Sequence, residues 1–143
     1  MNKTKLVLAG CCALLVGTVY CANGKTEYRD SMGRLQGTAR TSSSGKTEYR
    51  DSMGRLQGTA RTSSSGKTEY RDSMGRLQGT ARTSSNGKTE YRDAQGRLQG
   101  TSRTVNGKTE YRDAQGRLQG TSRTVNGKTE YRDAQGRLQG TKR

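Results

Sequence analysis

Residues 24–143 repeat a short pattern in which small or apolar side chains alternate with charged or polar ones. In the second copy, the runs Lys46–Asp51 and Arg55–Thr62 alternate in this way, with Thr, Tyr, Gly and Ala between Lys, Glu, Gln and Arg. A period of two residues is typical of a β-strand that buries one face. Turn-forming residues separate the two runs, so each copy predicts one β-hairpin.

The copies recur at a period of 20 or 21 residues and share the frame G-K-T-E-Y-R-D-x-x-G-R-L-Q-G-T-x-R. A fixed period of this length indicates a tandem array whose units pack on their neighbours. We therefore predict an all-β protein in which residues 23–143 form an elongated antiparallel β-hairpin repeat array, either a meander or a two-sided solenoid. The six copies begin at Gly24, Gly45, Gly66, Gly87, Gly107 and Gly127.

The first turn of each copy sets the alignment of its two strands. Residues 51–54 have Asp in the first position and Gly in the fourth, which favours a type I turn. With Asp51 opposite Gly54, Tyr49 faces Leu56, and both share a face with the Gly and Ala of the second strand. A one-residue bulge at Gly54 would relax the splayed strands, but it would move Leu56 to the other face. We favour the turn without the bulge.

The second turn gives the same two faces independently. Asn106-Gly107 is a strong signal for a two-residue hairpin turn, which pairs Thr104 with Thr109 on the Tyr/Leu face. In the 21-residue copies, a three-residue loop that ends in Gly66 keeps this register. The agreement favours folded hairpins over the alternative, a disordered chain, which the basic, Gly/Ser-rich composition would also permit.

The segment before the repeats predicts export. Two lysines precede an uncharged run over residues 6–22, which is typical of a secretory signal peptide that forms a short helix and is cleaved after Cys21 or Ala22. Residues 8–11 also spell a bacterial lipobox, so lipidation at Cys11 is a second interpretation. An uncleaved membrane anchor over residues 1–22 is a third. We expect a periplasmic, cell-surface or secreted bacterial protein.

The repeat frame resembles two bacterial families of hairpin repeats. The stretch T-E-Y-R-D-S-M-G-R-L resembles the YD (Rhs-type) repeat, although Arg rather than Tyr precedes Asp30. The spacing also resembles that of variant MORN repeats. The resemblance implies β-hairpins and a scaffolding role at a membrane or cell surface, and it transfers no catalytic residue. The positions that match the variant MORN spacing are Gly24, Tyr28, Gly33, Leu35 and Gly37.

Composition argues against catalysis. The chain has no His, and its three Cys all lie in the predicted signal segment, so the mature part offers neither an imidazole nor a thiol. Only 27% of residues are hydrophobic, which is too few for a compact core around a pocket. We predict no enzymatic activity, no cofactor and no metal site. The expected role is structural or interactive, at the cell envelope or outside the cell.

A net charge of +15, with 27 Lys and Arg against 12 Asp and Glu, makes the arginines the candidate functional residues. They recur along the charged face, which predicts binding to an acidic polysaccharide, lipid A, extracellular DNA or an anionic membrane. The alternative is a surface that only maintains solubility. The candidates are Arg29, Arg34, Arg40, Arg50, Arg55, Arg61, Arg71, Arg76, Arg82, Arg92, Arg97, Arg103, Arg112, Arg117, Arg123, Arg132 and Arg137.

Two further expectations concern partners. Specific recognition of nucleic acid is not expected, because the tyrosines lie on the face opposite the arginines. Self-association is expected, by stacking or by edge-to-edge pairing, because the Tyr/Leu face is thin and an open array has two unpaired strand edges. A threonine-rich surface for ice or another solid has less support, because the outward threonines occur once per unit and are flanked by charge.

Overall fold

A computed structural model describes residues 24–143, and the predicted signal segment, including Cys11, lies outside the described residues. Within this range the chain forms regular β-strands joined by short turns, and each copy of the repeat contributes two strands. The strands are β1 (Lys25–Asp30), β2 (Leu35–Thr41), β3 (Lys46–Asp51), β4 (Leu56–Thr62), β5 (Lys67–Asp72), β6 (Leu77–Thr83), β7 (Lys88–Asp93), β8 (Leu98–Val105), β9 (Lys108–Asp113), β10 (Leu118–Val125), β11 (Lys128–Asp133) and β12 (Leu138–Lys142).

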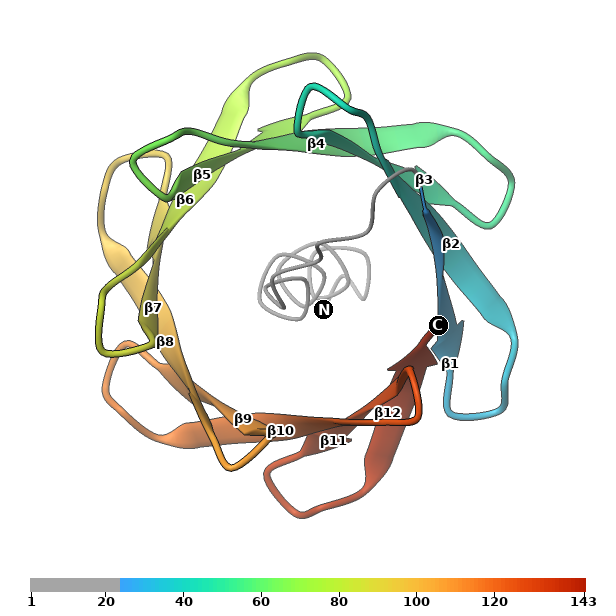
Figure 1. Cartoon of the computed structure of the whole chain (residues 1–143), viewed down its shortest axis with the longest axis vertical. Coiled ribbons are helices and arrows are strands. Elements are labelled where there is room, and N and C mark those ends of the chain that lie inside the picture. The colour runs from blue at the N-terminus through green and yellow to red at the C-terminus, as the bar shows by residue number, and fades with distance from the viewer. Residues whose placement is uncertain (1–23) are drawn as a thin grey trace, which may run out of the picture.

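The twelve strands form a closed antiparallel barrel (Figure 1). Each strand pairs with the next, and β12 returns to pair with β1. The predicted all-β fold of antiparallel hairpin repeats is therefore confirmed. The predicted elongated shape is wrong, since the array is neither an open meander nor a two-sided solenoid. Closure removes the two free strand edges that an open array would expose.

The stagger between hairpins explains the closure. Gly37 lies opposite Tyr28 in β1 and opposite Asp51 in β3. Asp51 is two residues beyond Tyr49, the equivalent of Tyr28, so each hairpin shifts the register by two residues. Six such shifts give a stagger of twelve residues around twelve strands. This stagger corresponds to a strand tilt of about 35–40° and a backbone radius of about 11 Å.

The seam between β1 and β12 repeats the pairing found between all other hairpins. Arg29 lies opposite Thr141 across the seam, as Arg50 lies opposite Thr38 between β2 and β3. The backbones of Glu27 and Arg143 exchange two hydrogen bonds, with N···O distances of 2.8 and 3.1 Å. The two edges on which the expected edge-to-edge pairing depended are thus joined to each other.

The turns between hairpins have the predicted register. Thr104 pairs with Thr109 across the two-residue turn, and Thr62 pairs with Thr68 across the longer one. Asn106 has a φ of 51°, and Gly107 has a φ of 73°. These left-handed conformations are those of a type I′ turn, which favours the Asn-Gly pair because the turn needs positive φ at both positions.

The turn within each hairpin differs from the prediction. The predicted type I turn forms, because the Gly54 N–H donates to the Asp51 carbonyl oxygen. However, Asp51 pairs with Arg55 through a backbone hydrogen bond of 3.0 Å, so the one-residue bulge at Gly54 is present after all. Type I turns splay the strands of a two-residue hairpin, and a glycine bulge with a φ of 82° relieves that.

A second bulge follows in the same strand and explains why only part of the face assignment changes. Tyr49 pairs with Gly58 and Arg50 pairs with Leu56, which leaves Gln57 as the extra residue. Two bulges shift the register by two residues, so Gly58 stays on the tyrosine face. The leucine moves to the charged face beside Arg50. The predicted Tyr/Leu face is therefore a face of Tyr, Thr, Gly and Ala or Ser.

The tyrosine face lines the inside of the barrel. A closed sheet crowds its inward side chains together and spreads its outward side chains apart, and the buried residues belong to the tyrosine face. Tyr70 is 6% exposed and packs between Ala60 and Ala81, with Tyr49 and Tyr91 on either side. These contacts form part of a ring of tyrosines, one per hairpin.

The burial of Tyr91 predicts an unusual alkaline titration. Burial raises the pKa of Tyr91 to about 12, while its hydroxyl shares a 2.8 Å hydrogen bond with Ser102. A phenol in the unfolded chain ionises near pH 10. The stability from this protonated phenol is therefore fully present below about pH 10 and is lost as the pH rises through about 12.

Burial also raises the pKa of Tyr111. We expect the tyrosinate absorbance of Tyr91 and Tyr111 to appear together with the loss of the β circular dichroism signal. Tyr91→Phe should remove one late-titrating phenol. Ionisation of both phenols near pH 10 with the β signal intact would contradict their burial inside the barrel.

Candidate functional site

The outward face of each first strand carries a compact set of ion pairs. In β3, the Glu48 carboxylate lies 3.2 Å from the Lys46 ammonium and 3.1 Å from the Arg50 guanidinium. The hydrogen bond from Lys46 and that from Arg50 lower the pKa of Glu48. Arg50 also donates to the carbonyl oxygen of Gly54 at 2.9 Å. The same Lys–Glu–Arg set recurs in all six hairpins.

A second class of arginine lies at the turn within each hairpin. Arg55 is paired with Asp51 through an Nε···Oδ2 contact of 2.8 Å. The pKa of Asp51 is lowered, chiefly by a hydrogen bond from the backbone N–H of Arg55. Gln57 donates to the same carboxylate at 3.1 Å. This carboxylate holds the turn together and compensates the charge of its arginine.

The third class of arginine has no acidic partner within the described residues. These arginines are exposed and lie on the second strand of each hairpin, near the turns between hairpins, except Arg143, which directly follows β12. Arg61 lies directly opposite Lys46 in the register of β3 and β4, and opposite Glu69 in the register of β4 and β5. Glu69 makes its ion pairs with Lys67 and Arg71 rather than with Arg61. Two like charges in directly opposed positions repel each other and destabilise a sheet. The unpaired arginines are Arg40, Arg61, Arg82, Arg103, Arg123 and Arg143.

Together with their lysine neighbours, these arginines form a ring of cations around one end of the barrel. We call this ring the basic belt. Its only acidic neighbours are the glutamates of the Lys–Glu–Arg sets, each of which already contacts two cations. The belt consists of Lys25, Arg40, Lys46, Arg61, Lys67, Arg82, Lys88, Arg103, Lys108, Arg123, Lys128 and Arg143.

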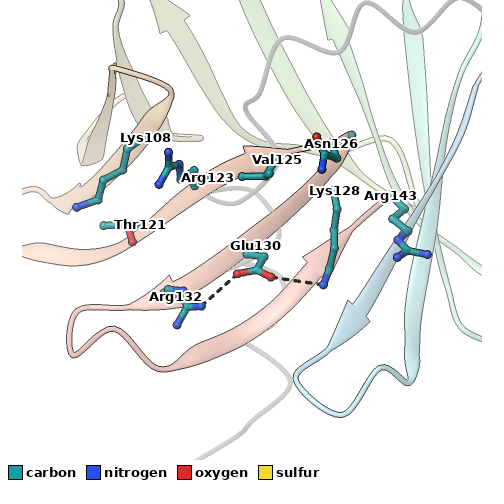
Figure 2. Close-up of a pocket in the computed structure, with 10 residues that line it drawn as sticks. Lys108, Thr121, Arg123, Val125, Asn126, Lys128, Glu130, Arg132 and Arg143 are labelled. Atoms are coloured by element: carbon teal, nitrogen blue, oxygen red, sulfur yellow. Dashed lines mark hydrogen bonds and ion pairs between the residues drawn. The ribbon is translucent and has the colours of Figure 1, made fainter.

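The belt is hollowed into grooves beside its unpaired arginines. Figure 2 shows the groove around Arg123, which has a volume of about 920 Å³ and is flanked by Lys108, Lys128 and Arg143. Glu130 is the one acidic residue that lines it, and this carboxylate is paired with Lys128 and with the arginine two residues beyond.

One hairpin earlier, a smaller groove of about 490 Å³ surrounds the equivalent Arg103. It is lined by Lys88 and Lys108, and Glu110 is its one acidic lining residue. Lys108 lines both grooves, so the two are consecutive sections of one basic track. Thr101 and Val105 complete the wall of the smaller groove, which therefore presents apolar as well as charged surface.

The structure thus separates the seventeen predicted arginines into three classes. Twelve contact a carboxylate and five do not, and Arg143 is a sixth unpaired arginine that sequence reasoning missed. The lysines of the belt were also missed. The register shift of two residues in each hairpin places Lys46 opposite Arg61. An alignment of the two strands that included both bulges would have predicted this opposition.

Within residues 24–143, no three side chains of the metal-binding types His, Cys, Asp and Glu gather into a cluster. The same part of the chain contains no helix that is long and apolar enough to cross a membrane. The predicted lipidation at Cys11 falls outside the described residues.

Comparison with known proteins yields no family. No protein-family profile matches the chain, and no curated protein matches its sequence. Among solved structures, BamB from Moraxella catarrhalis is similar at 11% identity and a TM-score of 0.33, over 77% of this chain and 58% of that one. A GtfA/B complex bound to UDP and GlcNAc has 18% identity and a TM-score of 0.24, over 70% of this chain and 22% of that one.

ASR alternansucrase in complex with isomaltononaose has 24% identity and a TM-score of 0.23, over 85% of this chain and 13% of that one. This chain therefore spans less than two thirds of each of the three proteins. TM-scores this low carry no conclusion about the fold or the function of this barrel.

Proposed function

We propose that this chain is an exported, non-enzymatic bacterial repeat protein with an interaction role at the cell envelope or outside the cell. The signal-like sequence of residues 1–22 supports export. The proposal that it binds polyanions rests on one observation. In every complete hairpin an arginine without an acidic partner faces a lysine across the strand pair, as Arg61 faces Lys46.

This arrangement leaves the arginine without an ion pair in the free protein and favours an anionic ligand. A carboxylate, sulfate or phosphate between the two cations would replace repulsion by attraction. The guanidinium fork of the arginine can bind such a group through two parallel hydrogen bonds. Each contact would also release counterions from the polyanion, so affinity should fall steeply as salt rises.

The other charged groups are less suited to an external ligand. Arg50 already donates to Glu48 and to the Gly54 carbonyl oxygen. Arg55 is held by Asp51 at the opposite end of the hairpin. A ligand that recruited either arginine would have to displace existing hydrogen bonds. The belt lysines also contact the glutamates, as Lys46 contacts Glu48, so the unpaired arginines of the basic belt are the groups on which we place the polyanion.

A matched pair of variants tests the proposal. The belt variant carries Arg61→Gln, Arg82→Gln and Arg103→Gln, and the control carries Arg55→Gln, Arg76→Gln and Arg97→Gln. Both lose three positive charges from the same hairpins. With heparin as the probe, we expect the belt variant to lose about tenfold or more in affinity and the control to lose much less. Titrations at low and physiological salt measure the difference.

Equal losses in the two variants would show that only net charge matters. If the unmodified chain binds no heparin at physiological salt, the belt is a device for solubility and the polyanion proposal is wrong.

A further inference from the structure

We infer that the ligand of the basic belt is a flexible, single-chain acidic polysaccharide that wraps around the barrel. This inference rests on the proposed polyanion binding and adds the class and path of the ligand. It follows from the closure of the belt, its curvature and the absence of outward aromatic side chains from residues 24–143.

The belt continues across the seam without a gap. Arg143 exchanges backbone hydrogen bonds with Glu27, which places it where Arg40 lies relative to Glu48. The last unpaired arginine is therefore adjacent to the first hairpin. A ligand that follows the belt meets the same arrangement of charges at every hairpin and can return to its starting point.

The curvature of the belt restricts which ligands can use all of it. The backbone radius of about 11 Å and a side-chain reach of about 6 Å place the charges on a circle of about 17 Å radius and 100 Å circumference. A flat or straight surface that touches this circle at one cation is already about 8 Å from the cations one hairpin away. That distance is close to the Debye length of about 8 Å in physiological salt, so a flat ligand uses only a small arc.

The stiffness of duplex DNA excludes it as a wrapping ligand. Its persistence length of about 500 Å is roughly thirty times the radius of the belt, and the bending energy would be prohibitive over so short a path. An anionic membrane is likewise nearly flat on this scale. Duplex DNA and a membrane can each contact the belt along an arc, but neither can neutralise the positive charges around its whole circumference.

Among flexible polyanions, the outer face favours a polysaccharide over single-stranded nucleic acid. Binding of single strands relies on aromatic side chains that stack on the bases. The described tyrosines belong to the inward face, as shown by the burial of Tyr70, Tyr111 and Tyr131. The grooves instead offer hydroxyl groups such as that of Thr121, next to cations that suit carboxylate or sulfate groups.

The first test measures how binding depends on ligand length. The full-length protein is titrated with heparin fragments of graded length at several salt concentrations. We expect both the affinity and the steepness of its salt dependence to rise with length until the contour length reaches about 100 Å, and then to level off. Levelling off at about 30 Å would show contact along an arc and overturn the wrapping, although polyanion binding would stand.

The second test removes half of the belt. The half-belt variant carries Gln in place of Lys25, Arg40, Lys46, Arg61, Lys67 and Arg82. Long heparin should lose about half of its salt dependence, because a wrapped chain contacts every hairpin. Duplex DNA should keep nearly all of the salt dependence of its binding, because it contacts only an arc and the unmodified half of the belt still presents one. An unchanged salt dependence for long heparin would overturn the wrapping.

A third comparison separates the two flexible ligands. Single-stranded oligothymidine with the same number of negative charges as the heparin fragment should bind at least tenfold more weakly. Equal binding would overturn the assignment to a polysaccharide. Absence of heparin binding to the full chain at physiological salt would overturn the proposed function itself, and with it this inference.

Discussion

Gly79→Ala is expected to destabilise the barrel by about 2–4 kcal/mol, although alanine is normally better tolerated than glycine in a strand. The reason is a close approach between two backbones. A Cβ atom at position 79 would collide with the carbonyl oxygen of Arg92 in the neighbouring strand β7. A main-chain oxygen cannot move away without breaking the ladder in which Gly79 pairs with Asp93.

Thr80→Ala serves as the matched control, because Thr80 is the next residue of the same strand and points outward. We expect it to change the free energy of unfolding by less than about 1 kcal/mol. Urea unfolding followed by circular dichroism measures both variants. A Gly79→Ala protein as stable as the unmodified chain would show that the two strands do not approach as described.

Tyr70→Ser is expected to cost about 3–4 kcal/mol, whereas Leu77→Ser should cost about 1 kcal/mol or less. Tyr70 is almost completely buried between two alanines in the ring inside the barrel. Leu77 lies on the outer face, opposite Arg71, and is only partly buried. Removal of the tyrosine leaves a cavity in the ring, while removal of the leucine exposes little new apolar surface.

The comparison decides between the two possible positions of the leucine. Thermal unfolding of both variants is measured under the same conditions. If the bulges were absent, Leu77 would pack against Tyr70 inside the barrel, and the two substitutions would lower the melting temperature by similar amounts. Similar shifts would therefore contradict the outward leucine.

Local patterns in the sequence were sufficient to predict the strands and the turns between hairpins. The alternation in Lys46–Asp51 matches β3 residue for residue, and the Asn-Gly turn has the expected register. These features depend on interactions between residues close in the chain, which a repeat displays several times over. The charged residues of the first strand were placed together for the same reason, although the leucine of the second strand joins them on the outer face.

The closure of the barrel and the position of the leucine depend on small displacements that the alternating pattern does not show. A bulge adds one residue without changing the composition of the strand. In the sequence, Gly58 was the one indication of the second bulge, because a glycine inside a strand often marks a bulge or a close backbone approach. Without the resulting two-residue stagger, the sheet has no fixed curvature. The sequence pattern alone therefore predicts an open array.

The sequence predicts that the arginines recur on one face, but it does not predict their ion pairs. It cannot show that Asp51 holds Arg55 or that Glu48 holds Arg50. The unpaired arginine and the opposing lysine emerge only when the register is known. The continuity of the belt requires the seam, which brings together residues more than a hundred positions apart.

An intramolecular disulfide across the seam tests the closed barrel most directly. Arg29 and Thr141 are opposite each other, and no turn connects their strands. Directly opposed residues have Cα atoms about 4.5–5.5 Å apart, within the range that a disulfide requires. The variant carries Arg29→Cys and Thr141→Cys in a chain whose natural Cys11, Cys12 and Cys21 are replaced by Ser. The control combines Arg29→Cys with Thr80→Cys, on a distant strand.

We predict that mild oxidation of the dilute seam variant gives a monomer with one internal disulfide, while the control gives none. Free thiols or disulfide-linked dimers in the seam variant would show that β1 and β12 do not meet, and the closed barrel would be wrong.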